Sequence, residues 1–146
     1  MDLLEVFNLR TIAVVGASRD PSKWAHVVPL YLKKAGYRVI PVNPSAGEIW
    51  GEKAYRSLLE IPDEVEVVQV FRPSEEVPKI VDEVIKRKRD RGDVKVVWLQ
   101  LGIRAPEESK QRLMEAGIAL FEDMCMMETH SRLFGLKPLA PGESSS

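Results

Sequence analysis

The sequence predicts a single α/β domain of the doubly wound kind, built on a five-stranded parallel sheet. Short runs rich in β-branched residues alternate with longer helical segments, which is typical of βαβ units. The first of these runs, residues 11–15, leads directly into Gly16, where a tight turn to the first helix is expected. Counting strands along the chain, we expect the order 3-2-1-4-5, with helices on both faces of the sheet.

Each element follows from a local pattern. Strands are expected at residues 11–15, 38–42, 65–71, 94–99 and 118–121, and helices at about 25–35, 56–60, 74–91, 106–116 and 127–133. Gly36 and Gly117 end two of the helices, and Pro29 predicts that the first helix begins near it or is kinked there. Ser74 is the expected N-cap of the long helix. That helix has a buried face at spacings of three and four, made by Val77, Ile80, Val81, Val84 and Ile85.

Composition limits the classes of protein that fit. A chain of 146 residues with 45% hydrophobic and 29% charged residues suits one folded unit, which we place at residues 1–135. Residues 136–146, rich in Pro, Gly and Ser, are expected to form a flexible tail. A net charge of −1 gives no general attraction to nucleic acid or to a membrane surface. One cysteine, no long apolar stretch and no signal-like start lead us to expect a cytoplasmic protein.

Ligands of such sheets bind beyond the carboxyl ends of the strands, so the segment after the first strand is the most informative. Gly16-Ala17-Ser18 permits a tight turn and offers a hydroxyl, and Arg19 and Lys23 add positive charge. Backbone amides at the start of the next helix can donate to phosphate oxygens. The alternative is a plain strand-to-helix turn with solvated charges.

Two common nucleotide motifs are absent. The dinucleotide pattern G-x-G-x-x-G would need glycines where Ser18 and Pro21 stand. The second strand ends in Val42-Asn43-Pro44, with no acidic residue to hold a ribose hydroxyl, so NAD is disfavoured. The pattern G-x-x-x-x-G-K-[ST] of ATP- and GTP-hydrolysing proteins is also missing.

Four segments in order resemble a known family. They are residues 14–18, 36–44, 71–73 and 98–103, and together they look like the small stand-alone CoA-binding domain proteins. These Rossmann-like proteins are relatives of the CoA-binding domain of the succinyl-CoA synthetase α subunit and of ADP-forming acyl-CoA synthetases. The likeness extends over roughly residues 5 to 135.

The resemblance implies coenzyme A as the cofactor and gives each segment a role. Gly16, Ala17 and Ser18 would receive the diphosphate on backbone amides. Val42, Asn43 and Pro44 would border the adenosine and its 3′-phosphate, with Arg19 or Lys23 in reach. A wall for adenine and pantetheine would come from Phe71, Arg72, Pro73 and Val77. Gln100 and Gly102 would flank the pantetheine end, Gly102 by leaving room for it.

The resemblance does not carry synthetase activity, because the phosphorylated histidine and the nucleotide-grasping unit of those enzymes have no counterpart here. We therefore expect binding of CoA or an acyl-CoA without catalysis, as a carrier, a sensor or a partner to another enzyme. A small NAD(P)-type or acyl-transfer enzyme using the same crevice is the alternative. Cys125 and His130 make a weak nucleophile–base pair and a poor metal site, so no catalytic residue and no metal is expected. The basic run at residues 86–89 is interpreted as cations that complement a helix C-terminus.

Overall fold

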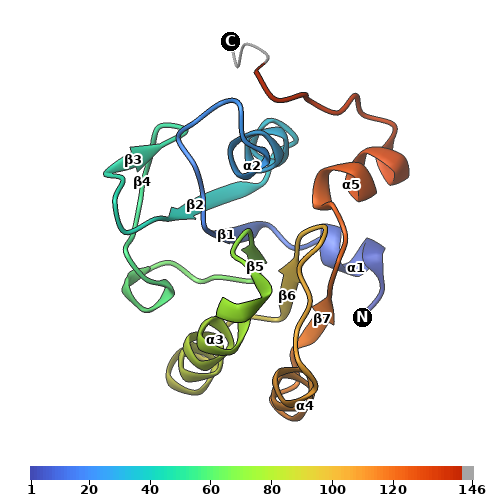
Figure 1. The fold of residues 1–146 in the computed structure, drawn as a ribbon. Helices are drawn as coiled ribbons and strands as arrows, with labels where there is room; N and C mark the ends of the chain where they lie inside the picture. Colours follow the sequence, from blue (N-terminus) through green and yellow to red (C-terminus); the bar gives the residue numbers. More distant parts are fainter. Residues whose placement is uncertain (143–146) are drawn as a thin grey trace.

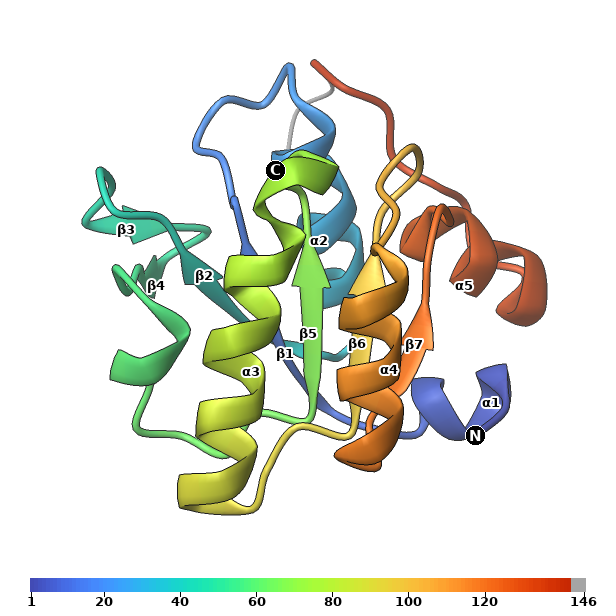
Figure 2. The same cartoon turned by 60° about the horizontal axis from the view of Figure 1, so that its bottom comes forward.

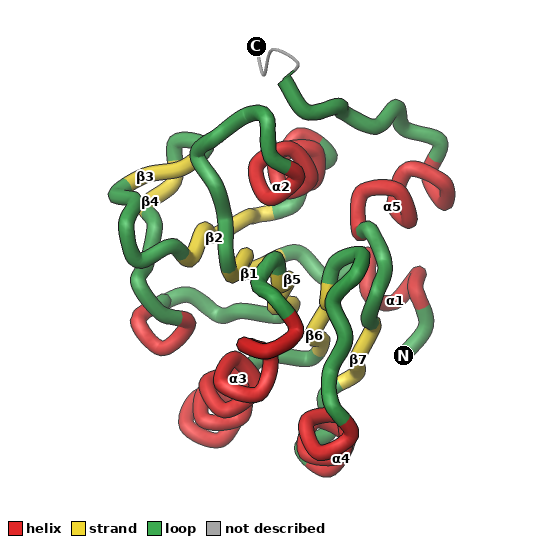
Figure 3. The backbone as a smooth tube through the Cα atoms, in the orientation of Figure 1, coloured by secondary structure: helices red, strands yellow, loops and turns green. Residues whose placement is uncertain are grey.

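The computed structural model describes residues 1–142 and shows a parallel sheet between two layers of helices (Figures 1 and 3). The sheet strands are β1 (Thr11–Val15), β2 (Arg38–Val42), β5 (Val67–Val70), β6 (Val96–Leu99) and β7 (Ala119–Phe121). The helices are α1 (Leu3–Phe7), α2 (Trp24–Lys34), α3 (Val77–Arg91), α4 (Glu107–Glu115) and α5 (Met126–Phe134). Smaller elements are a hairpin of β3 (Glu48–Ile49) and β4 (Glu52–Lys53), and the 3₁₀ turns η1 (Leu58–Glu60) and η2 (Ser74–Glu76).

The predicted fold class is confirmed, but the predicted strand order 3-2-1-4-5 is wrong. The sheet runs β2-β1-β5-β6-β7, so the third sheet strand pairs with β1 and not with β2. The outer edge of β2 is taken by Tyr55, whose N–H donates to Pro41 O at 3.0 Å and whose carbonyl accepts from Asn43 N at 2.9 Å. Residues 67–70 are buried on both faces, as an interior strand requires.

The segment that crosses from β2 to β5 is held by a buried arginine. Arg87, 1% exposed, donates through its guanidinium to the carbonyl oxygens of Leu58 and Ile61 at 2.6 and 2.8 Å. It also pairs with the Asp93 carboxylate, with Nε 2.9 Å from Oδ2. The sequence interpretation of residues 86–89, as cations that complement the helix C-terminus, did not foresee that Arg87 is buried. Its charge is fully occupied inside the protein.

Two apolar layers cover the faces of the sheet. One lies under α3 and α4, and it contains the predicted buried face of α3, with Ile85 packed at its margin. The other lies under α1, α2 and α5, and it includes Phe7, Leu32 and Trp98. In the part of the chain that the structure describes, no helix is long and apolar enough to cross a membrane.

Several element boundaries differ from the sequence predictions. Helix α3 begins at Val77 with Glu76 at its N-cap, and Ser74 instead starts η2 and accepts from Arg104 N at 3.0 Å. Val94 has a left-handed backbone (φ 65°), so the fourth sheet strand begins at residue 96 and not at 94. Helix α1 was not predicted, although Asp2 and Glu5 form its capping box.

The described part of the predicted tail contacts the domain. The N–H of Gly142 donates to Pro21 O at 2.8 Å, and Leu139 packs against the apolar layer under α2 and α5. The last four predicted tail residues, 143–146, lie outside the described residues. Flexibility of the tail stays a prediction.

His130 is enclosed by aromatic rings under α5. The ring centroids of Phe7 and Phe134 lie 5.1 and 4.6 Å from its imidazole. Its Nδ1 shares a hydrogen bond of 2.8 Å with the hydroxyl of Tyr31. Burial lowers the pKa of His130, because the charged imidazolium is poorly solvated there.

Replacement of Arg87 by Met should lower the free energy of unfolding by about 3–5 kcal/mol, because Asp93 then stays buried without its partner. Urea unfolding followed by circular dichroism measures this loss. Arg89→Met, an exposed position on the same helix, is the matched control and should change stability by less than about 0.5 kcal/mol. Equal effects of the two substitutions would contradict the structural role of Arg87.

The protein should lose stability as the pH falls below about 6.5, the ordinary pKa of an unfolded histidine. The folded pKa of His130 is lowered, so the unfolded state binds more protons in this range, and acid favours unfolding. His130→Gln removes the titrating group and should flatten the dependence of the unfolding free energy on pH between about 6.5 and 5. An unchanged slope in the variant would refute this assignment.

Candidate ligand-binding site

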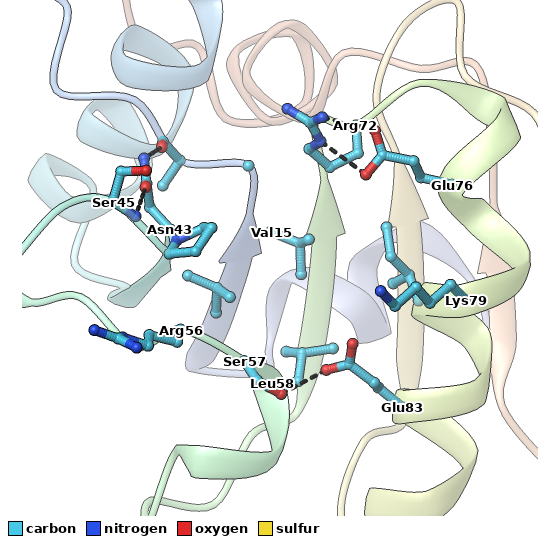
Figure 4. A pocket seen from close by; sticks show the side chains of 15 residues that line it. Val15, Asn43, Ser45, Arg56, Ser57, Leu58, Arg72, Glu76, Lys79 and Glu83 are labelled. Carbon is cyan, nitrogen blue, oxygen red and sulfur yellow. Dashed lines mark hydrogen bonds and ion pairs between the residues drawn. The ribbon is translucent and has the colours of Figure 1, made fainter.

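Two clefts open at the carboxyl edge of the sheet. The first cleft, of about 490 Å³, lies between the ends of β1, β2 and β5, the crossing segment and α3 (Figure 4). It is lined by Val15, Gly16, Ala17, Val42, Asn43, Pro44, Ser45, Arg56, Ser57, Leu58, Arg72, Glu76, Lys79, Ile80 and Glu83. The second cleft, of about 330 Å³, is lined by Trp24, Val28, Phe71, Gln100, Leu101, Ile103, Cys125 and Glu128.

The floor of the first cleft depends on Gly16. Its backbone is left-handed (φ 86°), and a Cβ atom built there would lie 2.8 Å from Cδ of Arg72. No real Cβ contact is that short, so both the backbone conformation and the packing require glycine. The turn after β1 and the end of β5 can approach each other closely for this reason.

The turn after Gly16 is tied to α2 through a proline. Helix α2 begins at Trp24, so Pro29 lies inside it and not at its start. The proline ring nitrogen carries no hydrogen for the carbonyl of Ala25 four residues earlier. That carbonyl instead accepts from Ser18 N at 3.2 Å. The His26 Nδ1–H donates to the Ser18 carbonyl at 2.8 Å and holds the same turn from the other side. Figure 2 shows the turn rising beyond the carboxyl end of β1 towards α2.

Several backbone donors at this turn are free. Among residues 1–142, the N–H groups of Ala17, Arg19, Trp24 and Ala25 donate to no protein acceptor. Lys23, the N-cap residue of α2, makes no capping hydrogen bond with its side chain. Free amides and the positive end of a helix dipole together favour an anion. The arrangement is suited to phosphate.

Charged side chains of both signs line the walls of the first cleft. The Arg72 guanidinium donates two hydrogen bonds to the Glu76 carboxylate, from Nε to Oε1 at 3.2 Å and from Nη2 to Oε2 at 2.6 Å. This contact raises the pKa of Arg72 and lowers that of Glu76. The side chains of Lys79 and Arg56 form no ion pair with any described residue. Figure 4 shows the Lys79 side chain directed into the cleft.

Asn43 links the ends of β1 and β2. Its Nδ2 donates to the Ala17 carbonyl at 2.8 Å, and its Oδ1 accepts from Ser45 N at 2.7 Å. Both ends of the amide are therefore used within the protein. Asn43 shapes the rim of the first cleft by holding two loops together.

The structure brings together part of the predicted site. Residues of the set that line the first cleft are Gly16, Ala17, Val42, Asn43, Pro44 and Arg72, and those that line the second are Phe71 and Gln100. Ser18, Arg19 and Lys23 lie in the turn between β1 and α2, and line neither cleft.

Three further predicted residues have other surroundings. Val77 is 1% exposed and packs in the core under α3, so it does not form a wall of either cleft. Pro73 is exposed at the start of η2. Gly102 has a left-handed backbone (φ 84°), which favours glycine, and a Cβ atom there would meet no protein atom within 4 Å.

Sequence reasoning missed the wall opposite β1. Arg56 and Ser57 come from the crossing segment and Lys79 and Glu83 from α3, with the Ser57 hydroxyl donating to Glu83 at 2.7 Å. The correct strand order carries the signal that would have found them. Because β5 lies next to β1, the segment that leaves the carboxyl end of β2 must cross β1 to reach β5, and its first residues lie beside the cleft.

Comparisons with known proteins found similar sequences and structures. A family model described as a CoA binding domain matches residues 10–131. The uncharacterized protein YneT of Bacillus subtilis is 38% identical over 122 residues, which cover 84% of this chain and 86% of YneT. A solved Thermus thermophilus structure, cell-free ID.343, has a TM-score of 0.82 and 44% identity, and the match covers 92% of this chain and 100% of that one.

One relative is part of a larger enzyme. The α subunit of the ADP-forming acetate–CoA ligase I of Pyrococcus furiosus is 38% identical over 89 residues. The match covers 57% of this chain but 19% of the ligase subunit. This chain therefore corresponds to about a fifth of that subunit.

Gly16→Ala should destabilise the protein by about 1–3 kcal/mol from backbone strain, and by more because of the contact with Arg72. Gly102→Ala is the matched control, since its φ of 84° is nearly the same and the space around it is open. Urea unfolding of both variants separates strain from crowding. If the two variants lose equal stability, the approach of Arg72 to Gly16 does not restrict this position.

Proposed function

The chain belongs to the CoA binding domain family, whose model matches residues 10–131, and from that premise we propose that it binds coenzyme A or an acyl-CoA across both clefts and catalyses no reaction itself. The observation that carries the proposal is the set of free backbone donors at the start of α2, directly beside a cleft with unpaired cations. CoA supplies several phosphate charges and a long uncharged arm, and the two clefts differ in the same way.

The phosphates are assigned to the turn after β1. The N–H groups of Ala17 and Arg19, and those of Trp24 and Ala25 at the start of α2, offer donors without acceptors among the described residues. Arg19 and Lys23 are exposed on this turn and add positive charge without lining the cleft. Ser18 contributes the shape of the turn, because its own amide is bonded to α2.

The adenosine is assigned to the first cleft. Pro44 and Val42 offer apolar contact from the end of β2, and Ile80 offers it from α3. Arg72 stands at the border of the turn, where it can exchange its bond to Glu76 for one to a phosphate. Lys79 and Arg56 supply two more cations for an additional phosphate group.

The pantetheine arm is assigned to the path from the first cleft to the second. Phe71 and Arg72 are adjacent in sequence but face different clefts, so one extended ligand passes both. Pro73 and Gly102 border this path at the ends of β5 and β6. Gln100 lies at its far end.

The proposed absence of catalysis rests on the surroundings of the cysteine and of the two histidines. Cys125 lines the second cleft, whereas His130 is buried among aromatic rings with its Nδ1 bonded to Tyr31. His26 is engaged with the Ser18 carbonyl. Neither histidine is placed as a base for the thiol, which nucleophilic catalysis requires. The ligase relative shares about a fifth of its length with this chain, which fits a domain that holds CoA for a partner enzyme.

Titration calorimetry should show that CoA binds with a dissociation constant in the micromolar range or below, and that NAD and ATP do not displace it at equal concentration. Arg72→Ala should weaken CoA binding about tenfold, because one charge-assisted hydrogen bond to phosphate is lost from a half-exposed position. Arg89→Ala, a cation at the far end of α3, is the matched control and should bind as the wild type does.

Binding of NAD(P) without any binding of CoA would overturn the proposal in favour of a small NAD(P)-type enzyme in the same crevice. Turnover of an acyl-CoA by the purified protein would overturn the non-catalytic part alone.

A further inference from the structure

We propose that the second cleft receives the thioester end of an acyl-CoA, with Gln100 Nε2 donating to the thioester carbonyl and a short aliphatic acyl chain lying on the apolar lining. This inference rests on the proposed function, because the rest of the ligand must occupy the first cleft. It adds a choice between ligands: the protein prefers an acylated CoA to the free thiol.

The orientation of the Gln100 amide is determined by its neighbours. Its Oε1 accepts from the backbone N–H of Met126 at 2.8 Å and from Gln69 Nε2 at 3.3 Å. If the amide were flipped, Nε2 would face the N–H of Met126, donor against donor. A backbone N–H cannot reverse its role, so the observed orientation is the one that the structure permits.

The same orientation leaves the Nε2 group of Gln100 free to donate to a ligand. Gln100 is 5% exposed and lines the second cleft, and in the described residues its Nε2 has no acceptor. Among the described side chains, Gln69 Oε1 is fully buried and has no hydrogen-bond partner. Gln100 Nε2 also has no acceptor but is not fully buried, so it remains accessible from the second cleft. A nearly buried amide donor of fixed direction that opens on a cleft is suited to a carbonyl oxygen.

Apart from Gln100, Cys125 and Glu128, the second cleft is lined by apolar side chains. Trp24 and Leu101 stand at its mouth with 53% and 68% of their surface exposed, and Phe71 and Ile103 line it. The pantetheine arm is common to CoA and acyl-CoA and is assigned to the path between the clefts. An acyl-CoA adds one carbonyl followed by an aliphatic chain, which free CoA lacks, and this addition matches an amide donor surrounded mainly by apolar side chains.

The test compares butyryl-CoA, CoA and ADP by titration calorimetry on the whole protein. Wild-type protein should bind butyryl-CoA about tenfold more tightly than CoA. Gln100→Glu keeps the oxygen that accepts from Met126 but replaces the Nε2 donor by a second oxygen. The variant should lose the preference for butyryl-CoA while its affinity for ADP, which reaches the first cleft alone, is unchanged.

Gln111→Glu makes the same change of charge on the exposed surface of α4 and should leave all three affinities as they are. Leu101→Ser is a second, independent variant at an exposed loop position, and it should weaken butyryl-CoA binding several-fold with little effect on CoA. If Gln100→Glu also loses ADP, Leu101→Ser decides the question.

Equal wild-type affinities for butyryl-CoA and CoA, or an undiminished preference in both variants, would overturn the inference while the proposed function stands. Absence of binding by either CoA species to the wild type would overturn the proposed function and the inference together.

Discussion

The buried charge of Arg87 is the constraint on which the arrangement of the site depends. A guanidinium removed from water must find an opposite charge and enough acceptors, and Arg87 finds them in Asp93 and in the carbonyls of Leu58 and Ile61. These bonds attach the crossing segment to α3. Residues 55–58 lie at the edge of β2 and beside the first cleft, so the buried ion pair supports one wall of the site.

A second constraint acts on the turn after β1. Pro29 frees the carbonyl of Ala25, and Ser18 occupies it, so the turn is attached to α2 without using the helix's first amides. Gly16 lets Arg72 approach from β5. Among the described residues, the combination leaves the first N–H groups of α2 without acceptors and near a cation. In most helices, a capping side chain would accept hydrogen bonds from such groups. In the proposed complex, a phosphate of the ligand would supply the missing cap.

The two clefts divide the surface by chemistry. The first is lined by most of the charged side chains, whereas the second is lined mainly by aromatic and aliphatic side chains, with Gln100, Cys125 and Glu128 as its polar residues. The adjacent residues Arg72 and Phe71 separate them. A ligand with charge at one end and an apolar chain at the other is complementary to the pair of clefts, and the family to which the chain belongs is named for a ligand of that shape.

The sequence by itself determined the fold class, the five sheet strands and the strand-end segments where a ligand is expected. These depend on local periodicity, on β-branched runs and on glycines such as Gly36, and such signals are carried by neighbouring residues. Gly16, Asn43 and Arg72 were found in this way, because the carboxyl end of a strand is visible in the sequence. Only the tertiary structure decided the strand order, the burial of Arg87 and of Val77, and the approach of Arg56 and Lys79 to the cleft. Each of these depends on pairing between segments far apart in the chain. A basic run or an apolar stripe has the same sequence whether its side chains face water or protein, so the sequence does not distinguish the two cases.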